Sequence, residues 1–192
     1  MSLTVEKCLQ AWANSLRQMN AKADIVFFGD SLTYYGDFSS VFPDKVVCNL
    51  GLRGDTIQGM IDRVDQVSFL KPKVIYLMAG INDVDSCSAV LFKELYDSLI
   101  YSIQKKVPNT KLVIQNILPV DNVNFSISCN NYQIEKYNQI IEGLTYHYKL
   151  YMIDLFSLYI KNGHLKEEMS IDGIHLKPDA YQLWYEALKI SK

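Results

Sequence analysis

The stretch Val26–Gly36, VFFGDSLTYYG, is the part of the chain on which the fold prediction depends most. A short apolar run that begins at Ile25 stops abruptly at Gly29-Asp30-Ser31. Such a run, followed at once by a turn, is typical of a strand that is covered on both faces. A serine placed directly after it can cap the next helix, or it can act as a nucleophile at the strand end. Residues elsewhere in the chain have to decide between these two roles.

Four further apolar runs resemble the first in length and composition: Val46–Leu50, Val74–Met78, Leu112–Ile117 and Leu150–Ile153. Amphipathic helical patterns lie before, between and after the five runs. Their apolar positions are Leu9, Trp12, Leu16 and Met19, then Ile57, Ile61, Val64 and Val67, then Leu91, Leu95, Leu99, Ile103 and Val107, then Tyr137, Ile140, Ile141 and Leu144, and finally Leu183, Trp184, Ala187 and Leu188. This alternation predicts an α/β fold with a doubly wound parallel sheet. Five strands favour the flavodoxin-like order 2-1-3-4-5.

Composition and charge narrow the class of protein. The 192 residues, 49% apolar and 21% charged, predict one domain over residues 1–192 with an ordinary buried core. A net charge of −2 gives no electrostatic footprint for nucleic acid or an acidic membrane, and predicts neither as a partner. No apolar run approaches the roughly 18 residues of a membrane span. Without a visible signal peptide, we expect a cytoplasmic protein. The oligomeric state is left open.

The cysteines and histidines give no sign of a metal site. Cys8, Cys48, Cys87 and Cys129 are far apart in the chain, and none belongs to a CxxC pair or a Cys/His cluster. We therefore predict free thiols, no metal and no cofactor.

Polar residues follow the first three predicted strands, and in such a sheet they share one edge with the ligand site. Ser31 follows the first strand, Gly54 the second and Asn82 the third. Each has a structural alternative: Ser31 can be a helix cap, and Gly54 can supply a turn with positive φ. Capping is also the expected role of Asp55 and Asp83, which stand where helices begin.

Asp172-Gly173-Ile174-His175, near the C-terminus, favours the nucleophile interpretation. A tight turn through Gly173 can bring the carboxylate of Asp172 to Nδ1 of the His175 ring and leave Nε2 free to take a proton. The alternative is a surface turn ahead of the helix that Pro178 starts. The other two histidines, His147 and His164, are interpreted as structural.

Together these residues supply the parts that acyl transfer requires. Ser31 provides the nucleophile, His175 the base and Asp172 the group that orients the imidazole. The backbone N–H groups of Ser31 and Gly54, with the side-chain amide of Asn82, can stabilise an oxyanion.

These motifs resemble the SGNH hydrolases, also called GDSL esterases and lipases. Four blocks match in order: Gly29-Asp30-Ser31-Leu32, the second block with Gly54, Gly80-Ile81-Asn82-Asp83, and Asp172-Gly173-Ile174-His175. The resemblance implies a three-layer α/β/α hydrolase with a Ser-His-Asp triad, no metal, and an oxyanion hole made by Ser31, Gly54 and Asn82. Asn49–Thr56 is similar to the corresponding part of platelet-activating-factor acetylhydrolase-like and bacterial acyl esterases. Gly51 is the alternative donor to Gly54.

The expected substrate is a small soluble ester with a short acyl group, above all acetyl, with a carbohydrate as one candidate for the alcohol part. Lysophospholipid and thioester substrates remain open alternatives. Tyr34, Tyr35 and Phe38 are candidates for the pocket wall, although core packing is expected for at least one tyrosine. The loop Val120–Asn131 is expected to lie on the surface, with a position over the site as the alternative. A non-catalytic, flavodoxin-like binding or signalling module is the rival class.

Overall fold

The computed structural model describes residues 21–190, and these contain a five-stranded parallel sheet in the order β2-β1-β3-β4-β5. The strands are β1 (Ile25–Gly29), β2 (Val47–Gly51), β3 (Val74–Met78), β4 (Lys111–Gln115) and β5 (Tyr151–Ile153). The predicted sheet order is confirmed, and each strand lies within two residues of its apolar run. The helix predicted for the first twenty residues lies outside the described part of the chain.

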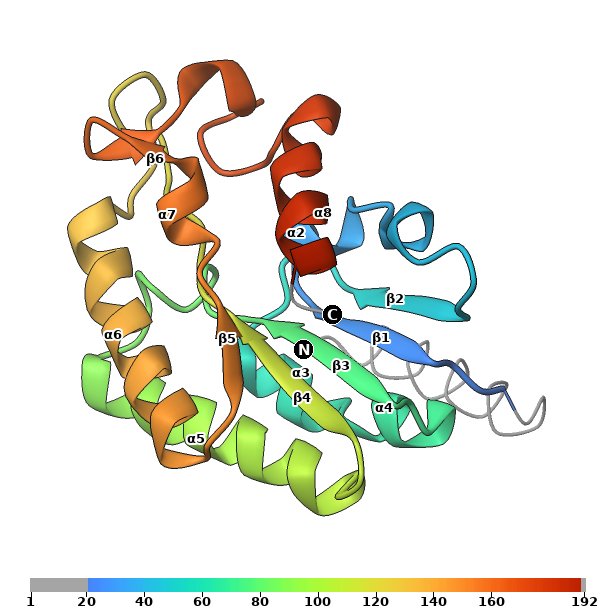
Figure 1. Cartoon of the computed structure of the whole chain (residues 1–192). Helices are drawn as coiled ribbons and strands as arrows, with labels where there is room; N and C mark the ends of the chain where they lie inside the picture. The colour runs from blue at the N-terminus through green and yellow to red at the C-terminus, as the bar shows by residue number, and fades with distance from the viewer. Residues whose placement is uncertain (1–20, 191–192) are drawn as a thin grey trace.

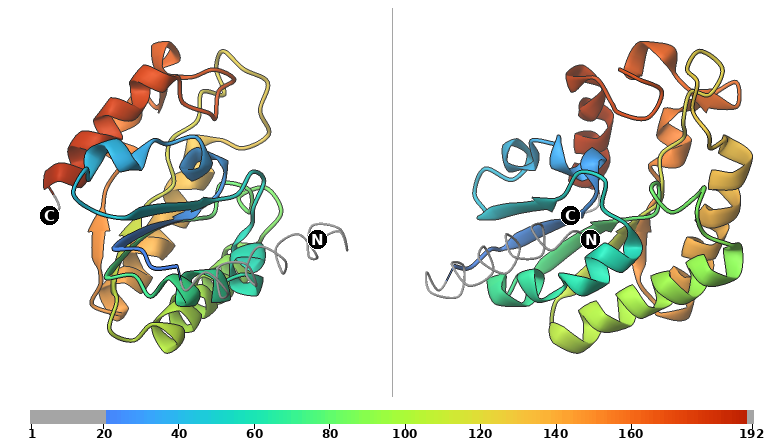
Figure 2. Two further views of the ribbon diagram at one scale, coloured as in Figure 1. Left: turned by 90° about the vertical axis from the view of Figure 1, so that its right-hand side faces the viewer. Right: turned by 180° about the vertical axis from the view of Figure 1, so that it is seen from behind.

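Helices cover both faces of this sheet and give the three predicted layers (Figure 1). One face carries α3 (Ile57–Asp62), α4 (Asp65–Leu70), α5 (Ala89–Lys106) and α6 (Asn131–His147). The other face carries η1 (Phe38–Val41), α7 (Phe156–Tyr159) and α8 (Tyr181–Ile190). The two views of Figure 2 show the sheet between these layers. The remaining elements are α2 (Ser31–Tyr34), η2 (Glu167–Met169), η3 (Pro178–Ala180) and the hairpin β6 (Ile160–Lys161) and β7 (His164–Leu165).

The alternation of side chains along β1 explains why both faces are apolar. Val26 and Phe28 belong to the core under α3–α6, while Ile25 and Phe27 belong to the core under η1 and α8. A strand that buries every side chain reads as a continuous apolar run, which is how it was predicted.

Two predicted helices differ in detail. The stripe from Ile57 to Val67 was predicted as one pattern, but the chain turns at Arg63 and forms two short helices, α3 and α4. The backbone N–H of Arg63 donates to the carbonyls of both Gly59 and Met60. The last turn of α3 is therefore tighter than an α-helical turn, and the helix ends there.

The predicted buried stripe of α5 is also partly wrong. Leu99 and Ile103 are buried as predicted, but Leu91 is 43% exposed, and the helix also buries Phe92, Tyr96 and Ile100. The two aromatic rings fill the core because they remove more apolar surface from water than the leucines beside them.

Candidate active site

The predicted site residues lie at the carboxyl edge of the sheet and in the last loop before α8. Ser31 is the first residue of α2, directly after β1, while Gly54 lies between β2 and α3. Asn82 follows β3, and because the strands are parallel the three loops share one edge of the sheet (Figure 1). Asp172 and His175 lie between η2 and η3.

Ser31, His175 and Asp172 form a continuous chain of hydrogen bonds. Oγ of Ser31 lies 2.9 Å from Nε2 of His175, and Nδ1 of the same ring lies 2.7 Å from Oδ2 of Asp172. An imidazole held between a carboxylate and a hydroxyl can accept the proton of that hydroxyl, and the carboxylate stabilises the cation that results. The fold thus brings together residues that are 144 positions apart.

The turn at Gly173 places Asp172 against His175. Gly173 has φ +92°, and a Cβ at this position would lie 2.9 Å from the carbonyl oxygen of Asp121. Oδ1 of Asp172 accepts hydrogen bonds from the backbone N–H groups of Ile174 and His175, at 3.1 and 2.8 Å. One carboxylate therefore fixes both the backbone and the ring of the histidine.

These hydrogen bonds decide the charge of Asp172. Partial burial opposes ionisation, but the N–H of His175, its ring and the N–H of Ile174 outweigh it and lower the pKa of the carboxyl. Asp172 is therefore a carboxylate at neutral pH, as a partner for an imidazolium must be.

Ser31 is not the cap of its helix. The N-cap of α2 is Asp30, whose Oδ1 accepts from the N–H of Leu32 at 2.9 Å. Ser31 is the first helical residue, and its hydroxyl is left for His175. The capping alternative for Ser31 is therefore wrong.

Three N–H donors at this edge of the sheet can each form a further hydrogen bond. Among residues 21–190, the backbone N–H groups of Ser31 and Gly54 have no hydrogen-bond partner. Gly54 is exposed and adopts φ +71°. Nδ2 of Asn82 donates one of its two hydrogens to the carbonyl oxygen of Asp55, at 2.8 Å, and the second remains. Gly51 is less suited, because its N–H is bound by Oδ1 of Asn49 at 2.8 Å.

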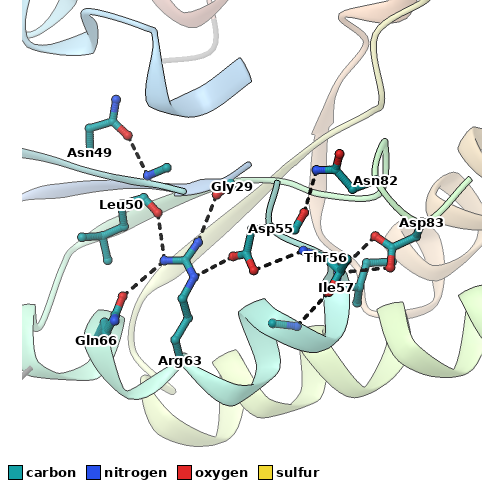
Figure 3. Close-up of polar contacts among 12 residues, drawn as sticks. Gly29, Asn49, Leu50, Asp55, Thr56, Ile57, Arg63, Gln66, Asn82 and Asp83 are labelled. Carbon is teal, nitrogen blue, oxygen red and sulfur yellow. Dashed lines mark hydrogen bonds and ion pairs between the residues drawn. The ribbon is translucent and has the colours of Figure 1, made fainter. Parts of the chain in front are cut away.

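A buried arginine ties these loops together beneath the site (Figure 3). The guanidinium of Arg63 donates to Oδ2 of Asp55 at 2.7 Å, to the carbonyl of Leu50 at 2.9 Å, to the carbonyl of Gly29 at 3.0 Å and to Gln66 at 3.2 Å. It thereby joins the last residues of β1 and β2 to the loop that carries Gly54. Arg63 was not predicted as part of the site. The only sign of it in the sequence was a cationic residue beside the apolar stripe Ile57–Val67.

The two predicted capping aspartates have different roles. Asp83 accepts from the N–H of Ile57 at 3.1 Å and so satisfies the start of α3, whose own N-cap is Thr56. Asp55 instead pairs with Arg63, with both side chains only 3% exposed. The capping prediction is thus confirmed for Asp83, but the helix that it caps is α3, which precedes it in the chain. For Asp55 the capping prediction is wrong.

Burial dominates the ionisation of three carboxyls in this region. Burial raises the pKa of Asp30 to about 7 and that of Asp83 to about 6, with hydrogen bonds from Leu32 and Ile57 opposing it. Burial also raises the pKa of Asp55, against the opposing effect of the Arg63 guanidinium.

Two cavities flank the candidate residues. One, of about 450 Å³, lies on the His175 side and is lined by Tyr35, Asp37, Ile171, Asp172, His175, Leu176, Pro178, Tyr181 and Tyr185. The other, of about 620 Å³, lies on the Asn82 side and is lined by Ile81, Asn82, Asp85, Ser126, Ile127, Ser128, Cys129 and Ile174. Four of these last residues belong to the loop Val120–Asn131, which is therefore more than a surface loop. Its ends are held together by Asn131, whose side chain bonds the N–H and the carbonyl of Val120.

The aromatic residues behind Ser31 separate into two groups. Phe38 is buried and its ring stacks on Phe27 at 3.8 Å, so its prediction as a pocket wall is wrong. Tyr34 and Tyr35 are 52% and 48% exposed, so the expectation that one of them packs in the core is also wrong. Tyr35 lines the cavity beside His175.

The other predicted features are found away from this chain of hydrogen bonds. His164 lies 3.7 Å from Asp121, and Cys48, Cys87 and Cys129 are free thiols, while Cys8 lies outside the described residues. Within residues 21–190, no group of three or more His, Cys, Asp or Glu side chains is arranged to hold a metal ion. In the same range, every helix is too short or too polar to cross a bilayer.

Solved structures share this fold at low sequence identity. A Streptococcus pneumonia protein provisionally described as a platelet activating factor gives a TM-score of 0.83 at 23% identity, covering 100% of this chain and 99% of its own. An Enterococcus faecalis lipase/acylhydrolase gives 0.75 at 22% identity, covering 87% and 93%. An acetyl xylan esterase, AlAXEase, gives 0.74 at 22% identity, covering 87% and 98%.

The fold is thus a three-layer α/β/α sandwich that is also found in a solved lipase/acylhydrolase and a solved acetyl xylan esterase. Residues 27–183 match the model of the GDSL-like Lipase/Acylhydrolase family, and the chain belongs to this family. This family is one of lipases and acylhydrolases, so membership favours a carboxylic ester hydrolase over the flavodoxin-like binding module. It is also 23% identical over 184 residues to the N-acylneuraminate cytidylyltransferase of Streptococcus agalactiae serotype V, covering 90% of this chain. The chain spans only 41% of the length of that relative.

Proposed function

We propose that the protein hydrolyses short-chain carboxylic esters through a covalent acyl-enzyme on Ser31. Oγ of Ser31 attacks the ester carbonyl carbon while Nε2 of His175 takes its proton. The tetrahedral intermediate collapses, and the C–O bond to the alcohol breaks as His175 returns the proton to the leaving oxygen. Water then attacks the acyl-enzyme, His175 takes a proton from it and gives it back to Ser31, and the acid leaves.

The observation that carries this proposal is the unbroken hydrogen-bond chain from Ser31 through His175 to Asp172, at 2.9 and 2.7 Å. The low pKa of Asp172 supports its role as the partner of the imidazolium.

Negative charge that develops on the carbonyl oxygen needs donors that are already in place. The uncommitted N–H groups of Ser31 and Gly54 and the second hydrogen on Nδ2 of Asn82 meet this requirement. Because Asn82 is held by the carbonyl of Asp55, its amide does not have to reorient during the reaction. We assign the oxyanion hole to these three residues.

For the substrate, we propose an acetyl or similarly short ester on a carbohydrate. Two proteins similar to this chain have names that refer to sugars, an acetyl xylan esterase and an N-acylneuraminate cytidylyltransferase. The exposed rings of Tyr34 and Tyr35 offer apolar faces on which a sugar ring can stack. A lysophospholipase or thioesterase would use the same mechanism, and the apolar side chains Ile171, Leu176 and Pro178 in the cavity beside His175 favour that second candidate.

The test compares wild type and Ser31→Ala on p-nitrophenyl acetate. We expect kcat to fall by about 10⁴–10⁶ in the variant, with an unchanged circular dichroism spectrum. Near wild-type turnover by folded Ser31→Ala would refute the assignment. A series of acyl lengths, an acetyl thioester and acetylated sugars then separates the substrate candidates.

A further inference from the structure

An exposed arginine and an exposed tyrosine contact each other beside the proposed catalytic histidine. Arg53 immediately precedes Gly54, and its guanidinium carbon lies 5.8 Å from the centre of the Tyr35 ring. The Tyr35 ring lies 5.8 Å from the His175 ring and is nearly perpendicular to it, at 89°. Arg53, Tyr35 and His175 therefore follow one another along the mouth of the site.

Within the described part of the chain, Arg53 has no ion-pair partner. Arg53 is exposed, and no carboxylate in residues 21–190 lies within 4.0 Å of its guanidinium. Neither acidic group of the cavity beside it binds Arg53: Asp172 binds His175, and Asp37 accepts from the hydroxyl of Ser39 at 2.6 Å. Up to five N–H donors in a planar fork, resting on an aromatic face, are thus open to a ligand.

The mechanism determines which part of the substrate lies beside Arg53 and Tyr35. His175 must return a proton to the leaving oxygen, so the alcohol part of the ester has to lie beside the His175 ring. Tyr35 lines the cavity on that side, and the guanidinium of Arg53 lies over the Tyr35 ring. The carbonyl oxygen points toward the proposed donors at Gly54 and Asn82.

We propose that Arg53, supported by Tyr35, binds a negatively charged group on the alcohol part of the substrate, so that the enzyme prefers anionic esters. A carboxylate and a phosphate each present two neighbouring oxygens, which a guanidinium binds through paired hydrogen bonds. This inference rests on the proposed function, because it uses the His175 proton transfer to place the alcohol.

The test measures a preference, not an activity. Wild type, Arg53→Gln and Lys111→Gln are assayed on 4-acetoxybenzoate, on its neutral counterpart 4-acetoxybenzamide and on 4-acetoxyphenyl phosphate. Lys111→Gln is the matched control: Lys111 is an exposed cation 5.9 Å from the Tyr151 ring, at the opposite edge of the sheet. Each result is the ratio of kcat/KM for the anionic ester to kcat/KM for the neutral 4-acetoxybenzamide. Because the three phenol leaving groups differ in basicity, this ratio is always compared with that of Arg53→Gln.

For wild type and Lys111→Gln we expect a ratio about five times that of Arg53→Gln for at least one anion, the size of one partly exposed charge-assisted contact. The carboxylate and phosphate arms show which anion is preferred. The decrease in Arg53→Gln should arise chiefly through a higher KM for the anionic ester, and salt should weaken the wild-type preference.

An equal ratio in Arg53→Gln and wild type overturns the inference. Equal losses on all three esters in Arg53→Gln also overturn it, because Arg53 would then support the Gly54 loop instead of binding the anion. These outcomes differ from failure of the proposed function, which appears as undiminished hydrolysis of the same esters by Ser31→Ala.

Discussion

Replacing Arg63 with methionine tests whether the buried cluster beneath the site holds the catalytic loops together. The Arg63 side chain is 3% exposed and donates four hydrogen bonds, to Asp55, Gln66 and the carbonyls of Leu50 and Gly29. Methionine fills similar space but leaves the Asp55 carboxylate buried without a counter-charge. Breaking a buried pair in this way costs about 3–5 kcal/mol, a large share of the roughly 5–15 kcal/mol that stabilises a typical domain.

The loss should depend on pH. Burial already raises the pKa of Asp55 above its unfolded value, and removal of the guanidinium raises it further. A folded-state pKa above the unfolded one means that stability falls as pH rises from the unfolded pKa, near 4, through the folded pKa. The variant can relieve its buried charge by taking up a proton at low pH, so it should lose more stability at pH 8 than at pH 5.

Urea unfolding followed by circular dichroism measures the free energy of unfolding at both pH values. Arg63→Met combined with Asp55→Asn removes the unpaired charge and should recover part of the loss at pH 8. Lys106→Met, which breaks the exposed ion pair with Asp65, is the control and should cost no more than about 1 kcal/mol. A loss below about 1 kcal/mol in Arg63→Met, an equal loss at both pH values, or no recovery in the double variant would refute the reasoning.

Three further predictions concern the site and its buried charges. Asn82→Ala should lower kcat by about 10²–10³, because one oxyanion donor is lost; an unchanged kcat in a folded variant would make Asn82 structural. Asp172→Asn should lower kcat by about 10⁴, because the amide cannot stabilise the imidazolium, and a loss under tenfold would contradict this. The pKa of Asp30, raised to about 7, predicts that the wild-type free energy of unfolding falls as pH rises from about 4 to 7. Asp30→Asn keeps an oxygen to cap α2 and should flatten that fall, as urea unfolding across this pH range would show; an equally steep fall would count against a buried charge at Asp30.

The sequence was sufficient to predict the strands because a doubly covered sheet leaves little choice of residue. The runs at Ile25–Phe28 and Val74–Met78 are apolar at nearly every position, and only burial on both faces explains such runs. The helices were harder to predict, since an amphipathic pattern tolerates a shift of one position. On α5, Leu91 fits the stripe as well as Phe92 does, and only packing selects the larger ring.

The candidate site could be predicted where a motif limits the chemistry, as at Ser31 and His175. Arg63 could not be predicted in this way, because an arginine next to an apolar stripe usually extends into solvent. The burial of Arg63 depends on hydrogen bonds to backbone carbonyls of two strands. The contact between Arg53 and Tyr35 joins side chains 18 positions apart, and it depends on their directions, which the sequence does not specify. Side-chain orientation, more than strand placement, is what the structure adds.

The central claim is that Ser31 is the nucleophile and that His175 activates it. Labelling with a fluorophosphonate, followed by mass spectrometry of the digested chain, tests this claim most directly, because only an activated hydroxyl reacts rapidly. We predict one label per chain on Ser31, no label in Ser31→Ala and strongly slowed labelling in His175→Ala. An active enzyme that is labelled at another residue, or labelled at Ser31 at the same rate without His175, would contradict it.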